Sequence, residues 1–257
     1  MLTPEAASGL ALSVAMAGAA GLVGCFAVMR RMSLASDALS HVALPGIGIA
    51  LALHLHPALG AVVALLLGAL LIWGLERRTG IPTETVVGVV FSLALAVGTL
   101  LATGEELVEA LLGAPGTLGP WEVGLGISGA AGVAAFILRE RHRLVLSLLS
   151  ADVARTSDVP VARTELLFLL AFALTVALGL RFLGVLLMGS LVIIPAATAK
   201  HLARSLGEMM AISVGVAILS TVGGELLAAR LARPSGPVII TVAAVLFLAG
   251  LPLRRAA

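Results

Sequence analysis

An all-α bundle of about eight or nine membrane-spanning helices is the fold that this sequence predicts, from its composition, its apolar runs and the placement of its charges. The 257 residues are 60% hydrophobic and only 12% charged, and a soluble domain carries about twice that charged fraction. Mean hydropathy is +1.15. Apolar runs of about 20 residues, enough to cross the hydrocarbon core, recur from end to end. We therefore expect residues 1–257 to form a single transmembrane domain.

The individual spans follow from the apolar runs, taken in chain order. The candidate spans are 8–29, 39–56, 57–75, 86–103, 120–138, 165–180, 182–199, 209–228 and 237–253. Two pairs of spans abut, one around Pro57 and one around Arg181. A count of eight, or one broken helix, therefore stays open beside the count of nine.

The basic residues predict how these spans are oriented. With the N-terminus outside, the inner side carries Arg30, Arg31, Arg77, Arg78, Arg139, Arg141, Arg143, Arg155, Arg163, Lys200, Arg204, Arg254 and Arg255. Only Arg181, Arg230 and Arg233 then lie outside. Because inner loops of membrane proteins are enriched in Lys and Arg, this asymmetry predicts an outer N-terminus and a cytoplasmic C-terminus.

The polar segment at about 139–164 is the longest connection on the predicted inner side. It is too polar to span a membrane, and four leucines, at 144, 146, 148 and 149, would give a short helix an apolar face. The segment is either a solvated connector or a docking surface for a cytoplasmic partner. Its length favours the docking surface.

Asp37 and His41 are the first candidates for metal ligands. Residues spaced i and i+4 share one face of a helix, and a carboxylate oxygen with an imidazole nitrogen suits Zn²⁺, Mn²⁺ or Fe²⁺. In the competing interpretation, Ser36 or Asp37 caps the helix and His41 packs against a neighbour. On the residues alone, both interpretations stay open.

Four further side chains are weaker candidates. Glu84 begins a span after a proline turn, where it could simply favour the helix N-terminus. Glu225 lies deeper in its own span, and either glutamate could line a pathway. His54 and His56 stand near the outer end of the second span. There a metal-catching role competes with ordinary interfacial placement.

Several other function classes lack their signatures in this sequence. The only lysine, Lys200, is followed by His201, so the GxxxxGK[ST] loop of ATPases is absent. GLGISG, residues 124–129, matches GxGxxG but lies in an apolar span with no strand before it. No aromatic and basic platform points to nucleic acid, which is not an expected partner. We expect no catalytic residues and no permanently bound cofactor.

The stretch RRMSLASDALSHVALPGIGIA, residues 30–50, resembles the signature of the zinc/manganese/iron-type ABC transporter permeases, the ABC-3 family. Three more stretches resemble the same family in the same order. They are PTETVVGVVFSLALAVG (82–98), FLGVLLMGSLVIIPAATAKHLARS (182–205) and RPSGPVIITVAAVLFL (233–248).

The resemblance implies a transmembrane subunit of a divalent metal importer, for zinc or manganese and with iron as a further option. It implies cytoplasmic ATPase subunits, an extracytoplasmic metal-binding protein and a second permease copy, expected to form a homodimer among the lipids of a bacterial plasma (inner) membrane. By the same resemblance, Asp37 and His41 are transient ligands of the transported ion, which moves by alternating access.

The inner segment also resembles the family, in its stretch for coupling to the ATPase. SADVARTSDVPV, residues 150–161, has Ala154, Arg155, Val159 and Pro160 in place. Ser150 stands where an aspartate is usual and Asp158 where a glycine is usual. The departure at Asp158 concerns the local turn.

Two rival functions remain beside the importer. One is a proton-coupled secondary transporter that uses Asp37 and His41 as a relay. Inverted repeats would support it, and none is evident in the sequence. The other is a membrane scaffold or regulator. Co-purification separates them, because only the importer requires an ATPase and a binding protein.

Overall fold

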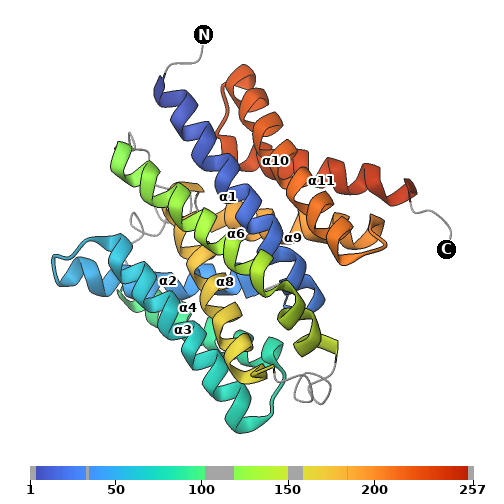
Figure 1. Ribbon diagram of the computed structural model, residues 1–257. Helices are drawn as coiled ribbons and strands as arrows, with labels where there is room; N and C mark the ends of the chain where they lie inside the picture. The colour runs from blue at the N-terminus through green and yellow to red at the C-terminus, as the bar shows by residue number, and fades with distance from the viewer. Residues whose placement is uncertain (1–3, 33–34, 102–118, 150–158, 184, 254–257) are drawn as a thin grey trace.

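The computed structural model describes residues 4–32, 35–101, 119–149, 159–183 and 185–253, and these fold into a bundle of α-helices (Figure 1). The helices are α1 (Pro4–Met29), α2 (Ala35–Ala52), α3 (Pro57–Thr79), α4 (Thr83–Leu101), α6 (Pro120–Leu149), α8 (Val161–Leu183), α9 (Val185–Leu202), α10 (Leu206–Leu231) and α11 (Ser235–Gly250). A short 3₁₀ helix, Leu251–Leu253, follows α11. Strands are absent from the described residues, so the predicted all-α fold is confirmed.

Each predicted span corresponds to one of these helices. Seven of the helices are long and apolar enough to cross a membrane, while α9 and α11 supply shorter apolar helices, Leu187–Leu202 and Ser235–Gly250. The expected break around Pro57 is present, because α2 ends at Ala52 and α3 begins at Pro57. At the second expected break, α8 continues past Arg181 to Leu183 and α9 begins at Val185, and residue 184 lies outside the described residues.

The polar segment 139–164 differs from the expected loop at both ends. α6 continues through Leu149, and α8 already begins at Val161. The apolar face expected there is present, because Leu144 is fully buried and packs with the core. An Arg143–Glu140 ion pair of 3.0 Å supports the polar side of the same helix. The span predicted from hydropathy ends at residue 138, whereas the helix α6 continues to Leu149.

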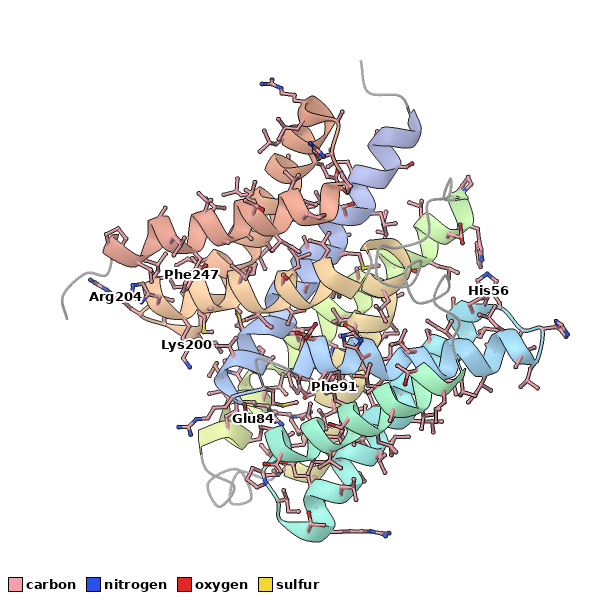
Figure 2. All side chains as sticks on the ribbon, turned by 180° about the vertical axis from the view of Figure 1, so that it is seen from behind. His56, Glu84, Phe91, Lys200, Arg204 and Phe247 are labelled. Carbon is pink, nitrogen blue, oxygen red and sulfur yellow. The ribbon has the colours of Figure 1, made fainter. Side chains whose placement is uncertain are left out.

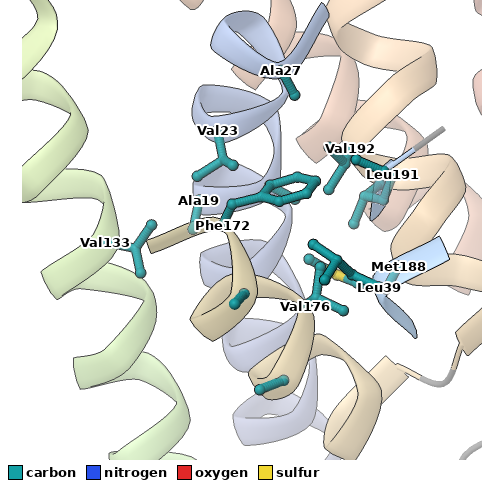
Figure 3. Close-up of a cluster of buried hydrophobic side chains, with 14 of the residues drawn as sticks. Ala19, Val23, Ala27, Leu39, Val133, Phe172, Val176, Met188, Leu191 and Val192 are labelled. Carbon is teal, nitrogen blue, oxygen red and sulfur yellow. The ribbon is translucent and has the colours of Figure 1, made fainter. Parts of the chain in front are cut away.

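The core of the bundle forms around α1. This helix packs against α6, α8, α9 and α10, and Figure 1 shows it running between α6 and α9. Figure 3 shows Phe172 of α8 among apolar side chains of α1 and α9, such as Val23 and Leu191. Gly24 of α1 permits this packing, since a Cβ there would overlap the carbonyl oxygen of Val192 on α9.

The other helices form two groups that meet through α9. α2 packs against α3 and α4, while α10 packs against α11 and α9, and α2 also packs against α9. Figure 1 shows α3 and α4 away from α10 and α11. Large apolar side chains of α3 and α4, including Leu67 and Leu93, are exposed on the outside of the bundle. An apolar exterior on long apolar helices is what a multi-pass membrane protein presents to lipid.

Candidate functional site

The first turn of α2 is held against α9 by a buried serine. Ser36 is fully buried, and its hydroxyl donates a hydrogen bond to the carbonyl oxygen of Gly189 on α9 at 3.4 Å. One turn later, the Ser40 hydroxyl donates to the Ser36 carbonyl oxygen at 2.7 Å. Ser36 thus lies inside the helix and joins two helices, a role that the expected N-cap interpretation did not include.

Asp37, the next residue, projects beside Gly189. A Cβ on Gly189 would lie 3.5 Å from Oδ1 of Asp37, in ordinary van der Waals contact, so Asp37 and Gly189 of α9 are close neighbours. Asp37 is exposed and lines a pocket of about 220 Å³. The pocket is lined by Met32, Ala35, Asp37, Ala38, Glu84, Val87, Gly88 and Phe91.

Glu84 is the second carboxylate of this pocket. It lies in the first turn of α4 and is exposed, while Asp37 comes from the first turn of α2. The packing of α2 against α4 brings the two acids to one cavity. Two carboxylates with an otherwise apolar lining can replace part of the water shell of a divalent cation.

The turn before Glu84 fixes where α4 begins. α3 ends at Gly80, whose positive φ of 67° is readily adopted only by glycine. Its amide N–H donates to the Glu76 carbonyl oxygen at 2.9 Å. The Thr83 hydroxyl then donates to the Glu76 carboxylate. These contacts join the end of α3 to the start of α4 and so position Glu84.

His41 lies one turn beyond Asp37 and contacts the pocket wall. Its ring meets Phe91 edge-on, with ring centroids 5.4 Å apart, and Phe91 itself lines the pocket. His41 is not among the lining residues. Its Nδ1 is buried and has no hydrogen-bond partner among the described residues. A buried imidazole nitrogen without a partner is costly unless something binds it.

The histidines at the other end of α2 have different surroundings. His54 is exposed in the connection to α3 and has a φ of 56°. His56 is the N-cap of α3, and its Nδ1 accepts a hydrogen bond from the Ala58 amide at 3.3 Å. Figure 2 shows His56 far along the bundle from Glu84 and Phe91. His56 therefore has a structural role at this helix start.

The remaining acidic candidate, Glu225, does not line the pocket. It lies on α10, which packs against α1, α9 and α11. Within the described part of the chain, no group of three or more His, Cys, Asp and Glu side chains stands ready to hold a metal ion. Asp37 and Glu84 thus form a pair of carboxylates in one pocket.

The expected coupling residues are only partly visible. Ala154 and Arg155 lie outside the described residues. Val159 is buried and Pro160 is exposed, and the Pro160 carbonyl oxygen accepts from the amides of Arg163 and Thr164 at 3.0 Å each. Pro160 therefore begins the first turn of α8, as proline at a helix start commonly does.

Comparison with known proteins adds to this geometry. A family described as the ABC 3 transport family matches residues 5–254. The high-affinity zinc uptake system membrane protein ZnuB of Haemophilus influenzae is 29% identical, over 99% of this chain and 98% of its own length. The manganese import system permease protein ScaB of Streptococcus parasanguinis is 30% identical, over 93% of this chain and 87% of its own length.

A solved structure is similar over nearly the whole chain. It is PsaBC from Streptococcus pneumoniae in complex with Fab, with a TM-score of 0.82 and 26% identity. The match covers 96% of this chain and 91% of the other. The overall fold described above is therefore shared with that solved structure.

Proposed function

Because the chain belongs to the ABC 3 transport family, we propose that it is the membrane-spanning permease subunit of an ATP-driven importer of zinc or manganese ions. The relatives named for zinc uptake and for manganese import match it over most of its length. The observation that carries the proposal is the convergence of Asp37 and Glu84 on one pocket at the start of α2 and α4.

The pocket acts as a transient site for the transported ion. The carboxylates of Asp37 and Glu84 attract the divalent cation and replace some of its water ligands. His41, with its partnerless Nδ1 one turn further along α2, is the next donor on the path. A transport site must release its ion, so a few protein ligands with remaining water suit it better than a four-ligand cage.

The mechanism is alternating access between the two sides of the membrane. An extracytoplasmic metal-binding protein delivers the ion to the outward-open form, and ATP-driven closure of cytoplasmic ATPase subunits opens the inner side. The chain has no ATPase loop of the GxxxxGK[ST] type, so a separate ATPase chain supplies the energy. The stretch 150–161 receives that subunit, and two copies of the chain pair as a homodimer.

The placement in the membrane completes the proposal. The protein lies in the bacterial plasma membrane with its N-terminus outside and its C-terminus in the cytoplasm. Arg30, Arg77 and Arg78 then stand at inner helix ends, as the distribution of basic residues favours. In this orientation the pocket of Asp37 and Glu84 opens near the inner ends of α2 and α4.

Uptake into proteoliposomes tests the function. The chain is reconstituted with its ATPase and its binding protein, and accumulation of Zn²⁺ and of Mn²⁺ is measured with and without ATP. We expect ATP-dependent uptake of one of the two ions. Metal uptake driven by a pH gradient in the absence of the ATPase would instead support the proton-coupled carrier. Failure to transport under both regimes would contradict transport altogether.

A further inference from the structure

Arg30, just after the end of α1, is directed into the bundle rather than toward solvent. Its Nη2 donates to the Ser147 hydroxyl of α6 at 3.1 Å, and its guanidinium carbon lies 4.9 Å from the ring centroid of Phe168 on α8. Every other arginine whose side chain the structure describes is exposed. Its neighbour Arg31, for example, lies at the surface. A largely buried arginine at a helix end calls for a specific explanation.

Charge explains how this burial is tolerated. Nε of Arg30 is buried and has no hydrogen-bond partner among the described residues. Burial lowers the pKa of Arg30, while the carboxylates of Glu165 on α8 and Glu76 on α3 act in the opposite direction. The cation is thus held where α1, α3, α6 and α8 meet. Separating it from these partners would leave charge uncompensated in a poorly solvated place.

One side of this junction reaches the start of α8. The indole N–H of Trp73 on α3 donates to the carbonyl oxygen of Ala162 at 3.1 Å. The guanidinium carbon of Arg77 lies over the same indole, 5.2 Å from the ring centroid. Ala162 directly follows the stretch 150–161, and Glu165 lies in the next turn of α8. A movement of the stretch 150–161 would therefore displace the start of α8, and with it the contacts of Trp73 and Arg30.

The other side of the junction reaches both pocket carboxylates. Glu76 accepts the hydrogen bond of Thr83, the residue before Glu84. Arg30 leads through a short turn to Met32, which lines the pocket. The amide of Met32 donates to the Ala27 carbonyl oxygen at 2.9 Å, and the amide of Ala35 donates to the Met32 carbonyl oxygen at 3.0 Å. This turn joins Arg30 to the first residues of α2.

We propose that Arg30 is a positioning residue that couples the start of α8, beside the ATPase-docking stretch, to the metal pocket between α2 and α4. This inference rests on the proposed function. Arg30 touches neither the ion nor the ATPase. It keeps the ends of α1, α6 and α8 moving together, so that a stroke received at α8 displaces the turn that carries Asp37. The packed contacts that could carry such coupling are those of Arg30 with Ser147 and Phe168, of Trp73 with Ala162 and of Glu76 with Thr83.

The test compares Arg30→Lys with Arg31→Lys in purified complexes with the ATPase and binding protein. Both variants keep the positive charge, but only Arg30→Lys loses the planar group that bonds Ser147 and stacks on Phe168. The readout is the number of metal ions taken up per ATP hydrolysed, which does not depend on how much complex assembles. We expect this ratio to fall by about tenfold in Arg30→Lys, and to stay at the wild-type value in Arg31→Lys.

A ratio in Arg30→Lys equal to that of the wild type would overturn the role of Arg30, as would an equal loss in Arg31→Lys. If Arg30→Lys does not assemble, Ser147→Ala removes only the hydroxyl acceptor and is measured in the same way, with an expected fall of about threefold. A wild-type complex without ATP-dependent uptake would instead contradict the proposed function, so the two failures are distinguishable.

Discussion

The two ends of α2 carry two groups of candidate metal ligands, and their surroundings differ. At the first turn, Asp37 shares a pocket with Glu84, and α9 lies alongside. At the last turn, His54 is exposed in a connection, and His56 caps α3 through its own ring nitrogen. The candidate ligands at the two ends of this one helix thus have different surroundings.

The difference teaches that convergence of helices, rather than ligand type, marks the site. α4 brings Glu84 to the pocket of Asp37, which lets oxygen atoms from two side chains replace part of the water shell of one ion. His54 does not line that pocket. A ligand that acts alone gains little affinity, because water remains the better partner for most of the ion's surface.

The largest effect is expected from Asp37→Asn, which keeps the shape of the side chain and removes its charge. Two unit charges about 4 Å apart near a protein surface interact by about 4 kcal/mol, so uptake should fall by about 100-fold or more. Initial rates of Zn²⁺ and Mn²⁺ uptake in proteoliposomes measure this. Rates within a few-fold of the wild type, with the complex intact, would mean that the path runs elsewhere.

A smaller loss is expected from Glu84→Gln. Both carboxylates are exposed, but Asp37 lies beside α9 as well as in the pocket shared with α4, so we expect uptake to fall less, by about tenfold, in Glu84→Gln. The matched control is Glu225→Gln, which changes an acid on α10 that does not line the pocket. Equal losses in both variants would show that overall charge matters and would contradict the assignment to the pocket.

His41→Gln should have a small effect of about threefold, because His41 does not line the pocket and contacts it only through Phe91, so no charge at the pocket is lost. The measurement is the apparent affinity for the ion during uptake. A companion variant, Phe91→Leu, separates the ring contact from the nitrogen. Loss of affinity in Phe91→Leu alone would assign the effect to packing and not to a ligand.

The smallest functional effect is expected at the other end of α2. His56→Ala should leave uptake unchanged and lower the free energy of unfolding by about 0.5–1 kcal/mol, because a capping acceptor is lost. Thermal unfolding in detergent detects the change, and His56→Asn, which supplies another capping oxygen, should restore it. A marked fall in uptake by His56→Ala with normal stability would contradict this and would indicate that His56 is a metal ligand.

Sequence reasoning predicted the helices well and the site only in part. Apolar runs located each α-helix of the described residues, since a helix in lipid must satisfy its own backbone hydrogen bonds. The spacing of Asp37 and His41 pointed to the start of α2. Its pairing with Glu84 depends on how α2 packs against α4, and nothing in the local sequence encodes that contact.

Two further features also lay beyond the sequence pattern. α6 continues through Leu149 as one helix, because Leu144 packs in the core, whereas the sequence suggested only a separate short helix with an apolar face there. The joining of Ser36 to Gly189 of α9 brings together residues 153 positions apart in the chain. Such long-range contacts follow from the assembled bundle and not from periodicity.

The most direct test of the central claim compares two double variants in one uptake experiment. Asp37→Asn with Glu84→Gln removes both pocket charges, and His54→Gln with His56→Asn changes both histidines at the opposite end of α2. The account predicts that the first pair abolishes ATP-dependent uptake of the ion and that the second keeps the wild-type rate. Wild-type uptake in the first pair, or its loss in the second alone, would contradict the account.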